Sequence, residues 1–187
     1  MKPVVIAITG ASGAIYAQTL LVALVRKRIR VHLTMTEAGA RLLREELGIR
    51  ADAERFVPAM LVRGAGSLVT YHHHSDIGAP IASGGCPTGG MAIVPCSMNT
   101  LGAVASGLGR NLIERAAAVT LKERRPLVIV PRETPLTTIM IENMLRLAQA
   151  GTCVLPAMPG FYEHPKRVDD LVDFIVKKIL VHLSIEE

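Results

Sequence analysis

Three turns of the sequence combine glycine, hydroxyl and charged residues in a way that suits a small anionic ligand. The first is Thr9-Gly10-Ala11-Ser12-Gly13, which lies between an apolar run and a helical pattern. Backbone N–H groups at a helix start, aided by the helix dipole, bind phosphate, and the Ser12 hydroxyl adds a further donor. A tight turn in which Ser12 only caps the helix would need the same residues, so both interpretations remain open for this turn.

The second turn is Pro95-Cys96-Ser97-Met98-Asn99-Thr100, which opens another helical pattern. Ser97 occupies the position of a helix N-cap, for which one hydroxyl suffices. Because Asn99 and Thr100 add two more polar side chains to the same helix start, the turn favours a ligand over a plain cap.

The third turn, Pro131-Arg132-Glu133-Thr134-Pro135, places a cation and an acid between two prolines. The Arg132 guanidinium could bind a phosphate through two parallel hydrogen bonds. A surface ion pair between Arg132 and Glu133 is the other interpretation, and such a pair would contribute little to stability.

Each of these turns follows an apolar run that predicts a buried strand. We expect strands at 4–9, 30–35, 91–95, 127–131 and 152–156. Helical patterns alternate with them at 15–28, 37–47, 97–106, 111–122, 135–150 and 168–183, the fifth with Pro135 in its first turn. This alternation indicates one parallel α/β sheet covered on both faces, with ligands beyond the carboxyl ends of its strands. The less regular segment 50–75 is assigned a short helix at 53–56 and a short strand near 61–63.

Length and composition indicate one globular domain. The 187 residues are 50% hydrophobic and only 3% aromatic, so the core must consist of aliphatic side chains. Three unpaired cysteines, Cys86, Cys96 and Cys153, suit a reducing cytoplasm. We expect neither a signal peptide nor a membrane span, because no apolar run approaches about 18 residues. The net charge of +5 comes from scattered basic residues without aromatic platforms, which favours small anions over nucleic acid.

Two features of a nucleotide-dependent dehydrogenase are present but incomplete. Ala14 and Tyr16 stand where the dinucleotide fingerprint requires glycines, and no acidic residue ends the second expected strand. The pair Tyr162-x-x-x-Lys166 contains Pro165, which breaks the helix needed to align the two side chains. We therefore exclude a dehydrogenase.

The tract His72-His73-His74 has the composition of a metal site. Neighbouring side chains on a strand point to opposite faces, so three adjacent histidines cannot easily converge on one ion. We therefore expect no metal here, and we expect His32 to pack in the core or at an interface.

Taken together, the motifs resemble those of UbiX-type flavin prenyltransferases. The resemblance rests on the three turns and on five further motifs in the same order along nearly the whole chain, and it is weakest over 50–74. These motifs are Ile81-Ala82-Ser83-Gly84, Asn111-Leu112-Ile113-Glu114-Arg115-Ala116, Leu121-Lys122-Glu123-Arg124-Arg125-Pro126-Leu127, Glu142-Asn143-Met144-Leu145 and Pro156-Ala157-Met158-Pro159-Gly160-Phe161-Tyr162. Each motif is modest alone, and their number and order make the match specific.

This resemblance implies a single Rossmann-like, three-layer α/β sandwich over residues 1–187. It implies a homo-oligomer, a dodecamer in the family, with sites between subunits. The implied reaction is a metal-independent transfer of the dimethylallyl group of dimethylallyl phosphate to reduced FMN, at flavin N5 and then C6. The prenylated FMN would pass to a UbiD-type decarboxylase in the cytoplasm.

The resemblance also assigns roles to single residues. FMN contacts would come from Gly10, Ala11, Ser12, Thr36, Ser97, Met98, Asn99, Thr100 and Arg132. The prenyl phosphate would be bound by Arg115, Lys122, Tyr162 and Lys178, and these groups would stabilise the departing phosphate where a metal otherwise does so. Proton movement at the flavin would be assisted by Ser12, Glu46 and Glu133.

One position departs from the family pattern, and two alternatives remain. Cys86 stands where relatives carry Phe or Trp, which puts the fit of the isoprenyl group in doubt, although Cys86 fits best as a small apolar filler. An FMN carrier without chemistry would need the glycine turns but not the cations. A flavin-dependent cysteine decarboxylase would need a catalytic histidine just before the 91–95 strand, and residues 75–93 contain none.

Overall fold

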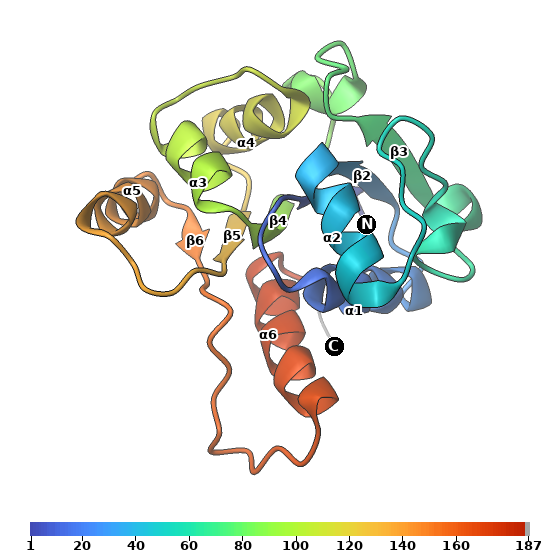
Figure 1. Cartoon of the computed structure of the whole chain (residues 1–187). Helices are drawn as coiled ribbons and strands as arrows, with labels where there is room; N and C mark the ends of the chain where they lie inside the picture. The colour runs from blue at the N-terminus through green and yellow to red at the C-terminus, as the bar shows by residue number, and fades with distance from the viewer. Residues whose placement is uncertain (186–187) are drawn as a thin grey trace.

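A six-stranded, all-parallel sheet forms the centre of the computed structural model, which describes residues 1–185 (Figure 1). Its strands are β1 (Val4–Ile8), β2 (Val31–Met35), β3 (Val69–His73), β4 (Met91–Cys96), β5 (Leu127–Pro131) and β6 (Cys153–Val154). They follow the order β3-β2-β1-β4-β5-β6. Strands β2 and β3 are added on one side of β1, and β4, β5 and β6 are added on the other side, so the order of addition switches sides between β1 and β4. This is the Rossmann-like order, and it confirms the expected parallel α/β architecture.

Helices cover both faces of the sheet in three layers. One face carries α1 (Ala14–Arg26), α2 (Glu37–Leu47) and α6 (Val168–His182), and the other carries α3 (Met98–Ala105), α4 (Leu112–Lys122) and α5 (Thr138–Gln149). Alternate residues of β1 enter the two apolar cores: Ile6 and Ile8 face the first, and Val5 and Ala7 the second. Because both faces are buried, β1 is apolar throughout. No helix within residues 1–185 has both the length and the apolar character required to cross a membrane.

Helix α2 approaches β1 very closely at Gly39, near the carboxyl edge of the sheet. A Cβ on Gly39 would lie 2.6 Å from the backbone oxygen of Ile8, a contact that only backbone movement could relieve. We expect Gly39→Ala to lower the free energy of unfolding by about 1–3 kcal/mol, although alanine is the better helix former. Denaturant unfolding measures this loss.

The matched control is Gly102→Ala in α3. A Cβ there would meet only the flexible side-chain amide of Asn143, at 3.2 Å. Its effect should be much smaller, and an equal loss in both variants would show that the approach of α2 to β1 is not what requires Gly39.

The segment between α2 and β3 differs from the sequence expectation. Residues 53–56 form bends and turns rather than a helix, and residues 61–63 form turns rather than a strand. The segment instead contains two short 3-10 helices, η1 (Pro58–Met60) and η2 (Gly66–Leu68), and the edge strand is β3. Leu61 and Val62 are buried in the first core without entering the sheet, so their burial produced a strand-like pattern.

The helix expected at 135–150 also begins later, at Thr138. Thr137 is its N-cap, and the Thr137 hydroxyl accepts a hydrogen bond from the Met140 amide at 3.3 Å. Pro135 therefore lies before the helix rather than in its first turn, because the hydroxyl cap sets the start. The other predicted strands and helices agree with the structure to within one or two residues.

Candidate functional site at the carboxyl edge of the sheet

A buried threonine joins the carboxyl ends of β1 and β4, where the strand order reverses. The Thr9 hydroxyl donates to the Pro95 carbonyl at 3.0 Å and accepts from the Ser97 amide at 2.7 Å. These two bonds hold the first and second predicted turns side by side. In open parallel sheets, ligands bind at this switch point.

A carboxylate from α2 binds the helix start that follows the first turn. Gly13 is the N-cap of α1 and has a φ of 115°, a conformation that favours glycine. The amides of Gly13 and Ala14 donate to Oε2 of Glu46 at 2.9 and 2.8 Å, and the Ser12 side chain also hydrogen-bonds this carboxylate. The amides that open α1 therefore bind an anionic group of the same chain, the carboxylate of Glu46.

The pKa of Glu46 reflects opposing influences. Partial burial raises this pKa, whereas the hydrogen bonds from Gly13, Ser12 and Ala14 and the positive charge of Arg132 lower it, and the net pKa is below the ordinary value. Glu46 is therefore ionised at neutral pH. A carboxylate bonded to a hydroxyl at a ligand-binding edge can accept a proton and return it.

The third turn contacts the first through Arg132. The Arg132 Nε donates to the Ser12 carbonyl at 3.2 Å, although 120 positions separate the two residues. Oε1 of Glu133 accepts instead from the Thr134 amide at 3.1 Å, and no ion pair between Arg132 and Glu133 occurs in the described part of the chain. Contact with the first turn, rather than a local ion pair, therefore positions Arg132.

The predicted cap of the second turn is confirmed. Ser97 Oγ accepts from the Thr100 amide at 3.3 Å and donates to the Thr100 hydroxyl at 3.0 Å, and Met98 begins α3. Asn99 is exposed at the same helix start. The Ser97 and Thr100 hydroxyls bond each other, so the exposed Asn99 is the polar side chain of this turn that is most accessible to a ligand.

The other predicted flavin contacts lie at the same edge. Thr36 caps α2 and accepts from the Gly39 amide at 3.0 Å. Gly10 is exposed and packs so closely on Ala38 that a Cβ would collide with it, while the amide of the buried Ala11 donates to the Thr9 carbonyl at 2.9 Å. The structure thus brings all nine predicted flavin-binding residues to the carboxyl edge of β1, β2, β4 and β5.

A cavity of about 230 Å³ lies beside Arg132, between the segments that follow β5 and β6. Arg132 and Glu133 line it together with Leu136, Met144 and Met158. A cation and an acid on a largely apolar wall suit a ligand with an apolar body and an anionic end.

Arg115 and Lys122 lie on α4, both exposed, and about 10 Å apart along the helix axis. A helix that connects parallel strands runs from the carboxyl edge back to the amino edge of the sheet. Lys122 ends α4 and therefore lies near the amino edge, where its Nζ is 3.5 Å from Oε1 of Glu123. Within one chain, Lys122 is not brought to the three turns.

Arg125 has a role that the sequence did not reveal. Its guanidinium donates to the carbonyls of Cys86 and Gly84, both at 2.7 Å, and to the Thr88 hydroxyl at 3.0 Å. Arg125 thus fixes the loop that contains Cys86 against the end of α4, close to Lys122. No local pattern signals this, because the partners of Arg125 are two backbone carbonyls and one hydroxyl about 40 positions away. Cys86 itself packs against the second core, as expected of an apolar filler.

Tyr162 and Lys178 form a separate group through Phe174. The Tyr162 ring meets Phe174 edge-on with centroids 5.9 Å apart, and Lys178 Nζ lies 5.8 Å from the Phe174 centroid. Tyr162 is 69% exposed and belongs to the segment between β6 and α6 that extends away from the sheet (Figure 1). Because α4 and α6 cover opposite faces, one chain does not gather all four predicted phosphate-binding residues.

Fold and site together define a class of protein. A Rossmann-like sheet with hydroxyl-rich and amide-rich turns at its switch point is a nucleotide-binding arrangement. Residues 1–180 match the family model described as Flavoprotein, and the chain belongs to that family.

Individual proteins that are similar to this chain identify a narrower family within the flavoproteins. The chain is 51% identical over 181 residues to the flavin prenyltransferase UbiX of Halalkalibacterium halodurans, which covers 97% of this chain and 88% of the relative. The crystal structure of AnUbiX (PadA1) in complex with FMN and dimethylallyl pyrophosphate has a TM-score of 0.87 at 37% identity and covers 99% and 93% of the two chains. The dodecameric FMN-dependent Ubix-like decarboxylase from Escherichia coli O157:H7 has a TM-score of 0.88 at 37% identity, covering 99% and 96%. The chain is a member of the UbiX family of flavin prenyltransferases, which confirms the resemblance.

Proposed function

We propose that this protein transfers the dimethylallyl group of dimethylallyl phosphate to reduced FMN, forming bonds at flavin N5 and then C6. The observation that carries the proposal is the meeting of three turns at the switch point. There Ser12, Glu46 and Arg132 form one hydrogen-bonded and charged group, in a chain whose relatives are named flavin prenyltransferases.

FMN would lie across the three turns. At the start of α3 the exposed side-chain amide of Asn99 supplies a hydrogen-bond donor, and Arg132 supplies a cation for an anionic group, whereas the Gly13 and Ala14 amides at the start of α1 are bonded to Glu46. The cavity beside Arg132 would enclose the apolar part of one of the two ligands. The predicted contacts are Gly10, Ala11, Ser12, Thr36, Ser97, Met98, Asn99, Thr100 and Arg132.

The prenyl phosphate would be bound by residues of more than one copy of the chain. Arg115 and Lys122 lie on one face of the sheet and Tyr162 and Lys178 on the other, so no single chain completes the set. We therefore propose a homo-oligomer, a dodecamer like the Escherichia coli neighbour, in which cations of one copy meet the turns of another.

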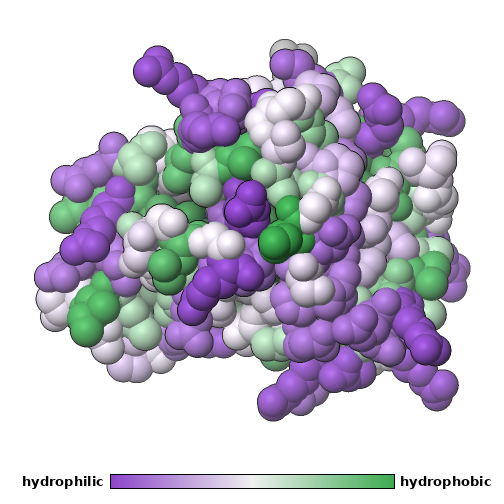
Figure 2. All heavy atoms as spheres, turned by 90° about the horizontal axis from the view of Figure 1, so that it is seen from above, coloured by the Kyte–Doolittle hydropathy of each residue, from purple (hydrophilic) through white to green (hydrophobic). Residues whose placement is uncertain are grey.

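Exposed apolar surface supports this assembly. Helix α5 buries only Leu147 and leaves Ile139 71%, Ile141 53% and Leu145 56% exposed. Figure 2 shows apolar side chains reaching the surface in separate patches among hydrophilic ones. The exposed apolar side chains gathered on α5 are the surface that we expect to contact other copies in the proposed oligomer.

The residues have distinct tasks in the proposed chemistry. Breaking the allylic C–O bond releases phosphate, whose negative charge Arg115, Lys122, Lys178 and the Tyr162 hydroxyl would stabilise. Bond formation at the flavin ring releases a proton, which Glu133 or the departing phosphate would accept. Ser12 and Glu46 would move protons at the flavin.

Anaerobic incubation of the protein with reduced FMN and dimethylallyl phosphate tests the proposal. Mass spectrometry of the flavin should show one added C5 unit, and parallel reactions with the monophosphate and the diphosphate identify the donor. Bound but unmodified FMN after complete reduction would contradict transfer and indicate a carrier.

The product would be used by another enzyme. We propose a UbiD-type decarboxylase in the cytoplasm as the recipient of prenylated FMN. A lysate of cells lacking a prenyltransferase would gain decarboxylase activity on addition of the protein's reaction mixture, and not on addition of FMN alone.

A further inference from the structure

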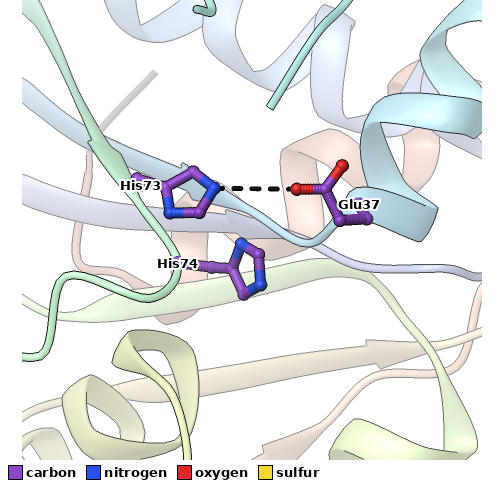
Figure 3. Close-up of side chains that lie close together, drawn as sticks. All are labelled: Glu37, His73 and His74. Carbon is purple, nitrogen blue, oxygen red and sulfur yellow. Dashed lines mark ion pairs between the residues drawn. The ribbon is translucent and has the colours of Figure 1, made fainter. Parts of the chain in front are cut away.

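Two histidines and a glutamate meet at the edge of the sheet, and none of them belongs to the residues proposed to bind FMN or prenyl phosphate. Figure 3 shows Glu37 at the start of α2, His73 at the last residue of β3 and His74 immediately after it. One potential ligand atom from each residue lies within 4.8 Å of the others.

The end of β3 explains why these side chains converge. Within the strand, His72 alternates with His73, and His72 Nε2 instead lies 2.9 Å from Nδ1 of His32. His74 follows the strand, so its side chain need not point to the face opposite that of His73. The ring centroids of His73 and His74 lie 4.5 Å apart. The expectation that adjacent histidines diverge therefore holds for His72 but is wrong for His73 and His74.

The spacing of the donor atoms suits a transition-metal ion. His73 Nε2 lies 3.6 Å from Oε1 of Glu37 and 3.4 Å from Oε1 of Glu54. Ligands placed tetrahedrally around Zn²⁺ at its usual bond lengths are about 3.3–3.6 Å apart. The pairs around His73 already have this separation.

Two ring nitrogens of the cluster lack a hydrogen bond. His73 Nε2 and His74 Nδ1 are both buried from solvent and have no hydrogen-bond partner among the described residues. Nδ1 of His73 lies 2.7 Å from the Ser75 hydroxyl and accepts a hydrogen bond from the Ser75 amide at 3.3 Å. Metal binding through Nε2 requires the tautomer in which Nδ1–H donates to the nearer Ser75 hydroxyl, and this tautomer gives up the bond from the Ser75 amide. The lone pair of Nε2 then faces carboxylate oxygens, which are also acceptors. A cation between them satisfies both, and a metal-bound histidine commonly has such an outer partner.

We propose that His73, His74 and Glu37, with Glu54 as a further carboxylate, bind a divalent late transition-metal ion of the Zn²⁺ class. Imidazole nitrogens with carboxylates suit Zn²⁺, whereas Mg²⁺ prefers octahedral oxygen ligands. The ion would join the start of α2, the irregular segment that carries Glu54 and the end of the edge strand β3. Its role is structural: the ion stabilises the β3 edge of the sheet and takes no part in prenyl transfer.

Calorimetric titration of chelator-treated protein with ZnCl₂ tests the site. We expect one Zn²⁺ per chain, no comparable binding of MgCl₂, and at least tenfold weaker Zn²⁺ binding in His74→Gln. His182→Gln, which changes an exposed histidine at the end of α6, is the matched control and should bind Zn²⁺ normally. Co²⁺ should give visible absorption of a low-symmetry site in the wild type, and His74→Gln should lose it.

Two results would overturn the site. One is the absence of stoichiometric Zn²⁺ binding, which would mean that a proton on His73 alone satisfies the two carboxylates. The other is unchanged Zn²⁺ affinity in both His74→Gln and Glu37→Gln. Prenyl transfer by the same samples in EDTA should equal that of untreated protein, so loss of the metal site and loss of the proposed function are measured separately.

Discussion

Lys122→Ala should reduce prenyl transfer by about 100- to 1,000-fold, the usual cost of removing one group that stabilises charge in a transition state. The variant should still bind FMN with unchanged affinity, because Lys122 is assigned to the prenyl phosphate and is not one of the nine proposed FMN contacts. Single-turnover transfer, followed by mass spectrometry of the flavin, measures the first quantity. Flavin fluorescence titration measures the second.

Arg124→Ala is the matched control, because it removes an exposed cation two positions away. It should leave both transfer and FMN binding close to wild type. Parallel loss of FMN binding and transfer in Lys122→Ala would contradict a role at the phosphate.

The same lysine tests whether the site is shared between copies. If Lys122 of one chain serves the turns of another, mixed oligomers of Lys122→Ala and Glu46→Gln chains contain some sites with both wild-type residues. Such mixtures should be much more active than either variant alone, each of which is expected to be at least about 100-fold less active than wild type. No recovery in verified mixed oligomers would contradict a site shared between copies.

Much of the fold could be predicted from local sequence patterns, because an apolar run of about five or six residues bounded by turn residues indicates a strand buried on both faces. β1 and β5 are buried on both faces, and their runs predicted strands to within one residue. Ser97 and its polar neighbours predicted a helix start that the structure contains. The edge strand β3 was missed because it is only partly buried and contains Thr70 and two histidines, which give no apolar run.

The site was predictable only where its residues follow strands. Ser12, Ser97 and Arg132 stand at strand ends, and the parallel topology brings such positions together. The contact of Glu46 with the first turn could not be read from spacing, because it depends on how closely α2 packs against β1 at Gly39. Arg125 was missed for a related reason, since its partners are carbonyl groups of a loop distant in sequence.

Glu46→Gln should lower prenyl transfer by about 100-fold or more, the usual contribution of a positioned acid or base. Glutamine keeps an oxygen that accepts the amides of Gly13 and Ala14, so the start of α1 should remain intact and FMN should still bind. Glu45→Gln is the control, because the neighbouring carboxylate pairs with Arg41 on the exposed surface of α2. Transfer near the wild-type rate in Glu46→Gln would remove Glu46 from the proton path.

The pH dependence of stability tests the charge on Glu46 independently of activity. The folded-state pKa of Glu46 lies below its ordinary value, so its carboxylate stabilises the folded state fully above the unfolded-state pKa of about 4.3. That stabilisation is lost as the pH falls through the lowered folded-state pKa. The difference in free energy of unfolding between wild type and Glu46→Gln should therefore be constant from about pH 6 to 8 and shrink below about pH 4. A difference that instead grows on acidification would mean that burial outweighs the hydrogen bonds of Gly13, Ser12 and Ala14, so that the folded-state pKa of Glu46 lies above its unfolded-state pKa.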